Sequence, residues 1–185
     1  MVVVIVIIVF IFIVLIGIHN DLISSRDKVA EALSGIDVQL KKRYDLIPNL
    51  ISTAKNYMKH EENILLEITS LRTKAVNNDL SQKEELDLNN QLSKKLQSLN
   101  VMVENYPELK ADTSFDNVQR SLNEVESQIS AARRAYNANV RQYNSKLEHF
   151  PSSIIANFKG LKKYNFFTIE SHEKENIDVD ELFKK

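Results

Sequence analysis

The segment from Leu22 to Tyr57 reads LISSRDKVAEALSGIDVQLKKRYDLIPNLISTAKNY and decides the fold. Its apolar residues recur at alternating spacings of three and four, which is typical of one helix with a narrow apolar seam. The seam consists of Leu22, Val29, Leu33, Ile36, Leu40, Ile47, Leu50, Ala54 and Tyr57. The same phase continues through Ile64, Ile68, Leu71 and Ala75, so periodicity alone does not place a turn. We predict a break in the helix between Met58 and Glu61.

An unbroken apolar run, Val2 to Ile18, precedes this segment. As a helix it measures about 25 Å, close to the hydrocarbon thickness of a bilayer. A cleaved signal peptide is the alternative, but it normally has a basic start and a small-residue cleavage site, and neither is evident here. We therefore predict a transmembrane anchor over residues 1–19, a helical bundle over 20–150, and a C-terminal docking helix and tail over 151–185.

The chain after the seam segment carries clear start and stop signals for a further helix. Asn77-Asn78-Asp79 indicates a loop, and Ser81 and Glu84 have the S-x-x-E spacing of a capping box. The predicted helix begins at Ser81 and has its own seam, Leu92, Leu96, Leu99, Val103 and Tyr106. Pro107 should end it, because the residue before a proline avoids helical geometry. We expect a loop from there to Asp112.

Asp112 or Thr113 is suited to cap what we predict to be the longest helix, which ends at Pro151. Its seam reads Phe115, Val118, Leu122, Val125, Ile129, Ala132, Tyr136, Tyr143, Leu147 and Phe150, with Asn139 as its polar break. Because this helix and the Leu22–Tyr57 segment have similar lengths, they are expected to pair along their whole length. The predicted fold is all-α: an elongated antiparallel up-and-down four-helix bundle that follows an N-terminal transmembrane helix.

Composition excludes several classes of protein. The chain has only three Gly and three Pro, which argues against an all-β fold, and it has no cysteine and therefore no thiolate site. Its net charge is −1 and its basic residues alternate with acidic ones, so nucleic acid is not an expected partner. His60-Glu61 lacks the second histidine of a zinc motif, and no phosphate-binding or nucleophile motif is present. We predict no enzyme activity, no metal and no cofactor.

Two polar residues, Arg43 and Asn139, occupy predicted seam positions. A buried cation or amide there requires hydrogen-bond partners and fixes the helix register. For Arg43 the simpler interpretation is favoured, in which the long side chain extends to the rim of the bundle. Burial with a partner across the bundle is the alternative.

Pro48 lies in the middle of the first predicted helix, where it removes the hydrogen bond to the Tyr44 carbonyl and should bend the helix. The irregular backbone beside Asp45 and Asn49 is a candidate partner-binding surface. A purely architectural bend is the favoured explanation.

The stretch Ile36–Leu50, IDVQLKKRYDLIPNL, followed by Tyr57 and His60-Glu61, strongly resembles the signature of the LemA family. A second block agrees, in which Tyr136-Asn137 and Tyr143-Asn144 repeat at a seven-residue interval before Phe150-Pro151, Gly160 and Phe166-Phe167. Phe167-Thr168-Ile169-Glu170 departs from many relatives, which place Glu directly after the aromatic pair. The resemblance implies a four-helix bundle inside the cell and no defined reaction. Our candidate partner-binding or structural block is Asp37, Gln39, Arg43, Asp45, Pro48 and Asn49, and our candidate polar seam is Asn137, Asn139 and Asn144.

The basic residues nearest the anchor, beginning with Arg26 and Lys28, all follow it in sequence. The positive-inside tendency therefore predicts a single-pass cell-membrane protein with its N-terminus outside and its bundle in the cytoplasm. We expect a non-enzymatic scaffold or adaptor that acts through protein partners at the bilayer; the alternative is a single-pass sensor or signalling protein. The resemblance points to a membrane-bound metalloprotease as one partner, and a homo-oligomer stays open.

Overall fold

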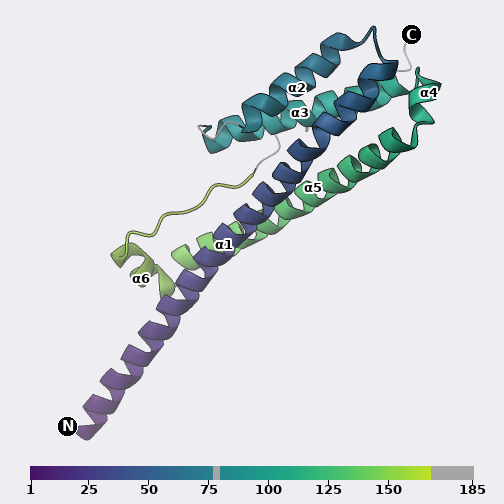
Figure 1. The fold of residues 1–185 in the computed structure, drawn as a ribbon. Coiled ribbons are helices and arrows are strands. Elements are labelled where there is room, and N and C mark those ends of the chain that lie inside the picture. Colours follow the sequence, from purple (N-terminus) through teal and green to yellow (C-terminus); the bar gives the residue numbers. More distant parts are fainter. Residues whose placement is uncertain (77–79, 168–185) are drawn as a thin grey trace, which may run out of the picture. The chain divides into compact units, whose positions relative to one another are not determined.

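The computed structural model describes residues 1–76 and 80–167, and within these ranges every regular element is a helix (Figure 1). The elements are α1 (Val2–Tyr57), α2 (Glu62–Val76), α3 (Gln82–Val103), α4 (Pro107–Lys110), α5 (Thr113–Glu148) and α6 (Ser152–Phe158). The predicted all-α class, with a long apolar helix at the N-terminus, is confirmed. The predicted loop at Asn77-Asn78-Asp79 and the tail from Thr168 onward lie outside the described residues.

The chain forms two compact units, and α1 and α5 each contribute to both. The first, which we call the bundle unit, is Leu33–Ala132. The second, the anchor unit, combines Met1–Ala32 with the chain from Arg133 onward. The boundaries that we predicted after residues 19 and 150 separate a membrane anchor, a helical bundle and a C-terminal docking segment, and they stay predictions.

In the bundle unit, parts of α1 and α5 pack with α2 and α3 in alternating directions. Arg43 of α1 bonds to α3 and α5, and Tyr44 of α1 bonds to α2. Buried apolar side chains from all four helices form the core, among them Ile36, Leu40, Ile47, Leu50, Ile68, Leu92, Leu99, Phe115, Val125 and Ile129. This alternating arrangement is the predicted up-and-down topology.

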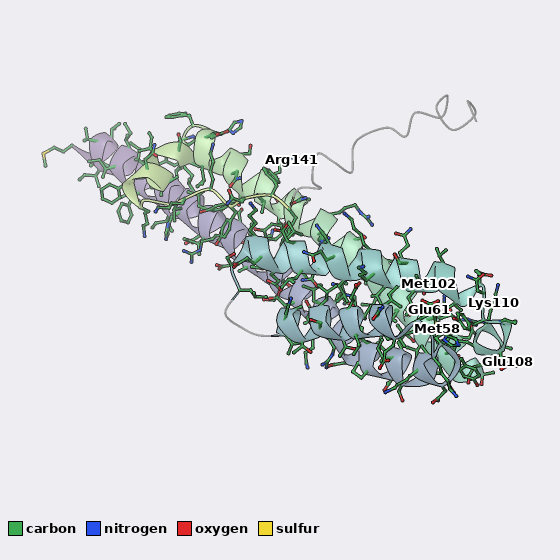
Figure 2. All side chains as sticks on the ribbon, turned by 90° about the horizontal axis from the view of Figure 1, so that it is seen from above. Met58, Glu61, Met102, Glu108, Lys110 and Arg141 are labelled. Atoms are coloured by element: carbon green, nitrogen blue, oxygen red, sulfur yellow. The ribbon has the colours of Figure 1, made fainter. Side chains whose placement is uncertain are left out.

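The turn between α1 and α2 falls at residues 58–61, as predicted. Met58 is buried there, and Figure 2 shows Met58 and Glu61 at the same end of the bundle unit as Met102 and Glu108. Tyr106 donates a hydrogen bond to Glu61 across this end, at 3.4 Å. The α1–α2 connection and the α3–α4 connection are therefore tied together.

Capping hydrogen bonds begin α3 and α5 where the sequence predicts. The amide of Glu84 donates to the Ser81 hydroxyl at 3.3 Å, and the Glu84 carboxylate accepts from the Ser81 amide at 2.9 Å. Asp112 accepts from the amides of Phe115 and Ser114 at 3.1 and 2.8 Å. The pKa of Asp112 is lowered below its ordinary value, most strongly by the hydrogen bond from the Phe115 amide. Hydrogen bonds from the Tyr57 hydroxyl and from Ser114 also lower it.

Two predicted details of these helices are wrong. Residues 107–110 are not a loop but the one-turn helix α4, because Pro107 needs no N–H partner in the first turn and can start a helix as readily as it stops one. The longest helix is α1 rather than α5, because the apolar run and the seam segment form one continuous helix of 56 residues. In the described part of the chain, α1 is the one helix long and apolar enough to cross a membrane.

Candidate functional site

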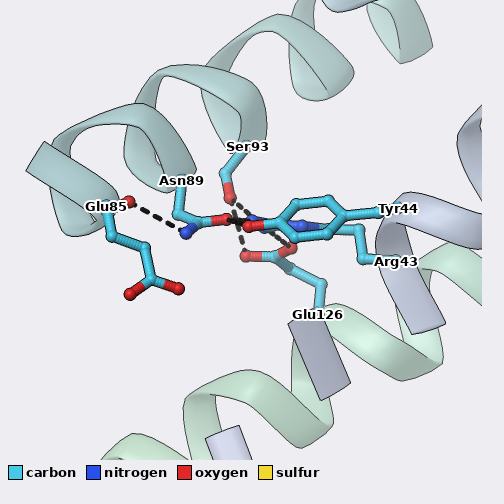
Figure 3. A network of polar contacts seen from close by, with 6 residues as sticks. All are labelled: Arg43, Tyr44, Glu85, Asn89, Ser93 and Glu126. Atoms are coloured by element: carbon cyan, nitrogen blue, oxygen red, sulfur yellow. Dashed lines mark hydrogen bonds and ion pairs between the residues drawn. The ribbon is translucent and has the colours of Figure 1, made fainter. Parts of the chain in front are cut away.

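Arg43 lies in the core of the bundle unit with 1% of its surface exposed. Its Nη1 donates to the Ser93 hydroxyl at 2.9 Å and to the Glu126 carboxylate at 3.0 Å, and its Nη2 donates to the Asn89 side-chain oxygen (Figure 3). The favoured interpretation, in which this side chain reaches the rim, is therefore wrong. Burial is possible because polar partners from two other helices accept hydrogen bonds from the guanidinium group.

The acceptors of Arg43 are themselves held in place (Figure 3). Asn89 accepts from the Tyr44 hydroxyl at 2.7 Å and donates to the Glu85 carbonyl at 2.8 Å. Ser93 donates to the second oxygen of Glu126 at 2.9 Å. Burial raises the pKa of Tyr44 above its ordinary value. We call Arg43, Tyr44, Asn89, Ser93 and Glu126 the polar cluster; it joins α1, α3 and α5.

Sequence reasoning found Arg43 but missed its partners. Asn89 carried a usable signal, because the spacing of Leu92, Leu96 and Leu99 extended backward places Asn89 on the same seam. Ser93 follows Asn89 by one helical turn and so faces the same neighbour. Glu126 gave no such signal, since it is one of many charged residues on α5.

Pro48 lies inside α1, which stays helical on both sides of it. The carbonyl that Pro48 deprives of its amide partner is that of Tyr44, and Arg72 of α2 donates to it from Nε at 2.8 Å. A backbone acceptor that would otherwise be unsatisfied thus binds a neighbouring helix. This contact favours the architectural explanation of Pro48 over an open recognition surface.

The remaining residues of the predicted block divide between a groove and the solvent. A groove of about 540 Å³ in the bundle unit is lined by Asp37, Leu40, Lys41, Tyr44, Asp45, Arg72, Ala75, Val76, Leu80 and Glu85. Desolvation raises the pKa of Asp37, and Asp45 pairs with Lys41 at 3.4 Å. Gln39 is half-buried, whereas Pro48 and Asn49 are exposed.

In the anchor unit, two of the three predicted seam asparagines hold the extended chain that follows α6. Asn144 donates to the Tyr164 carbonyl at 2.9 Å and accepts from the Tyr164 amide at 3.0 Å. Asn137 makes the same pair of bonds to Phe167, at 2.8 and 2.9 Å. Each side-chain amide therefore binds a main-chain N–H and C=O together, as a neighbouring strand would. We call Asn137 and Asn144 the asparagine clamp.

The tyrosines that precede these asparagines complete the contact. Tyr136 packs edge-on against Phe167 with ring centroids 4.8 Å apart, and Tyr143 packs likewise against Tyr164 at 5.5 Å. The repeated Tyr-Asn pair is thus two copies of one binding unit, placed two helical turns apart on α5.

The predicted seam places of Asn139 and Phe150 are both wrong. Asn139 is half-buried, and Val140 takes the buried position because the four-three-four spacing runs through Tyr136, Val140, Tyr143 and Leu147. Phe150 lies beyond the end of α5 and is exposed.

The polar cluster and the asparagine clamp both fall within residues 32–180, which match the LemA family. The chain belongs to the LemA family. Protein LemA of Metamycoplasma hominis is 28% identical, over 90% of this chain and 75% of its own length. Magnetosome proteins MamQ 1 and MamQ 2 of Paramagnetospirillum magneticum are each 22% identical, over 90% of this chain and 71% of theirs.

Membership of the LemA family assigns no chemistry to this helical architecture. None of the three relatives has a name that denotes a reaction. Within the described ranges, no group of three or more His, Asp or Glu side chains is arranged to hold a metal ion. The departure predicted at Thr168-Ile169-Glu170 lies outside the described residues.

Proposed function

We propose that this LemA-family chain is a membrane-anchored, non-enzymatic scaffold or adaptor that acts through protein partners. The observation that carries the proposal is the continuity of α1, which runs as one helix from the apolar run at Val2 to Tyr57. Arg43 on the same helix is bonded to α3 and α5, so the helix that enters the membrane also belongs to the buried polar cluster. Such a helix is suited to tether the bundle unit to the bilayer.

The groove beside Asp37 and Asp45 is the surface that we assign to the partner. Its lining mixes carboxylates with the cations Lys41 and Arg72 and with the partly exposed apolar residue Val76, so a protein partner with complementary charges would be held in one orientation. Groove residue Tyr44 is bonded to Asn89 of the polar cluster, which fixes that wall. A membrane-bound metalloprotease is the first partner to test, and a second copy of the chain is the competing occupant.

Site-specific photocrosslinking of the full chain in native membranes tests this proposal. A photoreactive residue in place of Asp37 or Asp45 should give adducts with another protein, identified by mass spectrometry. The matched control is Val101, which is exposed on α3 and does not line the groove. The proposed surface would be contradicted if neither groove position gave an adduct, or if Val101 gave as much adduct as the groove positions. Crosslinked dimers of the chain would assign the groove to self-association.

We also propose that the bundle lies in the cytoplasm with the N-terminus outside, because Arg26 and Lys28 follow the apolar run. A protease added to intact cells should then leave the bundle uncut, and lysis should expose it. Rapid digestion without lysis would reverse the orientation.

A membrane sensor is the second candidate, and the same continuity of α1 favours it, since a rotation of the anchor could reach Arg43. A sensor requires two helix arrangements of similar free energy. Crosslinks between Ser93 and Glu126 positions should then change when the lipid composition changes. An identical pattern in all lipids would favour the scaffold.

A further inference from the structure

The short helix α6 and Phe150, two residues before it, expose three large apolar side chains. Phe150 is 82% exposed, Ile154 60% and Phe158 90%. Ile154 and Phe158 are four residues apart and share one face of α6, whereas Ala156 is buried. Two exposed phenyl rings and an isoleucine within residues 150–158 concentrate apolar surface of the kind that marks an interaction site, and we call these three side chains the patch.

The patch lies at the level where α1 leaves its apolar run. Lys146, near the end of α5, bonds to Asp21 and Ser25 of α1 at 2.7 and 2.6 Å. The Ser152 hydroxyl, at the start of α6, donates to the Lys146 carbonyl at 2.6 Å. Asp21 follows Ile18 by three residues, which is about 4.5 Å along a helix. Within the anchor unit, α6 is therefore beside the exit of α1 from the bilayer that α1 would span (Figure 1).

The charges around the patch suit a lipid headgroup region. Lys159 and Lys162 follow α6 directly and are exposed, and Lys163 pairs with Glu148 on α5. Apolar and aromatic side chains flanked by lysines are typical of elements that lie in the boundary between acyl chains and headgroups. Anionic lipids would add attraction to these lysines.

We propose that Phe150 and α6 form a second membrane contact, in which Phe150, Ile154 and Phe158 insert into the interface of the bilayer that α1 spans. The occupant of the patch is lipid rather than protein. The inference rests on the proposed membrane anchor, because the position of α6 is defined relative to the end of that anchor. The contact would fix the tilt and rotation of α1 at the surface, which one spanning helix alone does not do.

The chain contains no tryptophan, so one introduced tryptophan reports on one position. The full-length Phe158→Trp variant is reconstituted in vesicles with and without lipids brominated on their acyl chains, and tryptophan quenching is measured. Phe150→Trp serves as an independent second reporter. Phe10→Trp, within the apolar run, is the positive control, and Val101→Trp, at a 68% exposed position on α3, is the negative control.

We expect quenching of Phe158→Trp and Phe150→Trp that is weaker than that of Phe10→Trp and clearly stronger than that of Val101→Trp. Quenching of Phe10→Trp alone would overturn the second contact and leave the anchor in place. Unquenched Phe10→Trp would instead overturn the anchor and the inference with it. A blue-shifted but unquenched Phe158→Trp would assign the patch to a protein surface and also overturn the proposal.

Discussion

Replacing Arg43 separates the contribution of packing from that of charge pairing in the bundle unit. Arg43→Ala removes the guanidinium group together with its buried stem, whereas Arg43→Met keeps a stem of similar shape without the charge. Arg43 is 1% exposed, but the Glu126 side chain is 42% exposed and can be hydrated when its partner is lost. Asn89 likewise keeps the hydrogen bond from Tyr44. Few groups are therefore left both buried and unpaired.

The expected magnitudes follow from this asymmetry. The two buried methylenes beyond Cβ, Cγ and Cδ, contribute about 1.6 kcal/mol at about 0.8 each. With one weakened hydrogen bond of about 1 kcal/mol, Arg43→Ala should cost about 3 kcal/mol, the lower end of the range for a broken buried pair. Arg43→Met should change the stability by less than about 1 kcal/mol, in part because it removes a buried Nε–H that has no partner among the described residues. Glu126→Ala, which leaves the cation buried, should cost about 3 to 5 kcal/mol.

Thermal melts of the full chain in detergent micelles, followed by far-UV circular dichroism, measure these differences. For a chain of this size, about 3 kcal/mol lowers the Tm by about 6 to 12 °C. In an Arg43→Met background, Glu126→Ala should lose most of its effect, which is the matched control. Equal losses for Arg43→Met and Arg43→Ala would refute the packing argument, and negligible losses for both would refute burial of Arg43 itself.

Three further predictions address the other contacts. Asn144→Ala removes two hydrogen bonds, which should lower the stability of the bound segment by about 1 to 3 kcal/mol. Amide hydrogen exchange of residues 161–167, measured by mass spectrometry, should then accelerate about 5- to 150-fold. The control Asn139→Ala should leave this exchange unchanged. Arg72→Ala should cost about 1.5 to 3 kcal/mol in urea denaturation, but less than about 1 in a Pro48→Ala background, where α1 supplies its own amide. Because backbone hydrogen bonds lower the pKa of folded Asp112, the stability that it contributes is present above the ordinary aspartate pKa and is lost as the pH falls through the folded value. Asp112→Asn should remove this acid-dependent loss from melts recorded at decreasing pH.

The sequence predicted those features that depend on neighbouring residues. The break at residues 58–61, the capping box at Ser81 and the cap at Asp112 all follow from groups within one helical turn of each other. Helix α4 was missed because Pro107 stops one helix and starts another, and the local pattern does not distinguish the two.

Features that depend on distant residues were not predicted. The partners of Arg43 lie 46 to 83 positions away, so nothing near Arg43 distinguishes burial from extension to the rim. The asparagine clamp binds backbone groups of an extended segment that has no pattern of its own. Its Tyr-Asn repeat was visible, but what the repeat binds was not.

The polar cluster is better explained by specificity than by stability. An apolar replacement of Arg43 should fold about as well, yet Asn89, Ser93 and Glu126 accept hydrogen bonds from Arg43 in only one register of α1, α3 and α5. A shift of α3 by one helical turn, about 5.4 Å, would move both of its acceptors away from the guanidinium.

That register also determines the shape of the groove that we assign to a partner. Tyr44 lines the groove while its hydroxyl is bonded to Asn89, and Arg72 lines it while bonded to the Tyr44 carbonyl. The Tyr44 carbonyl is available to Arg72 because Pro48 has no amide proton to offer it. Arg43 and the Tyr44 hydroxyl share the acceptor Asn89, whereas Pro48 leaves the Tyr44 carbonyl to Arg72. The proline and the buried arginine of α1 therefore help to position opposite ends of Tyr44, which forms one wall of the groove.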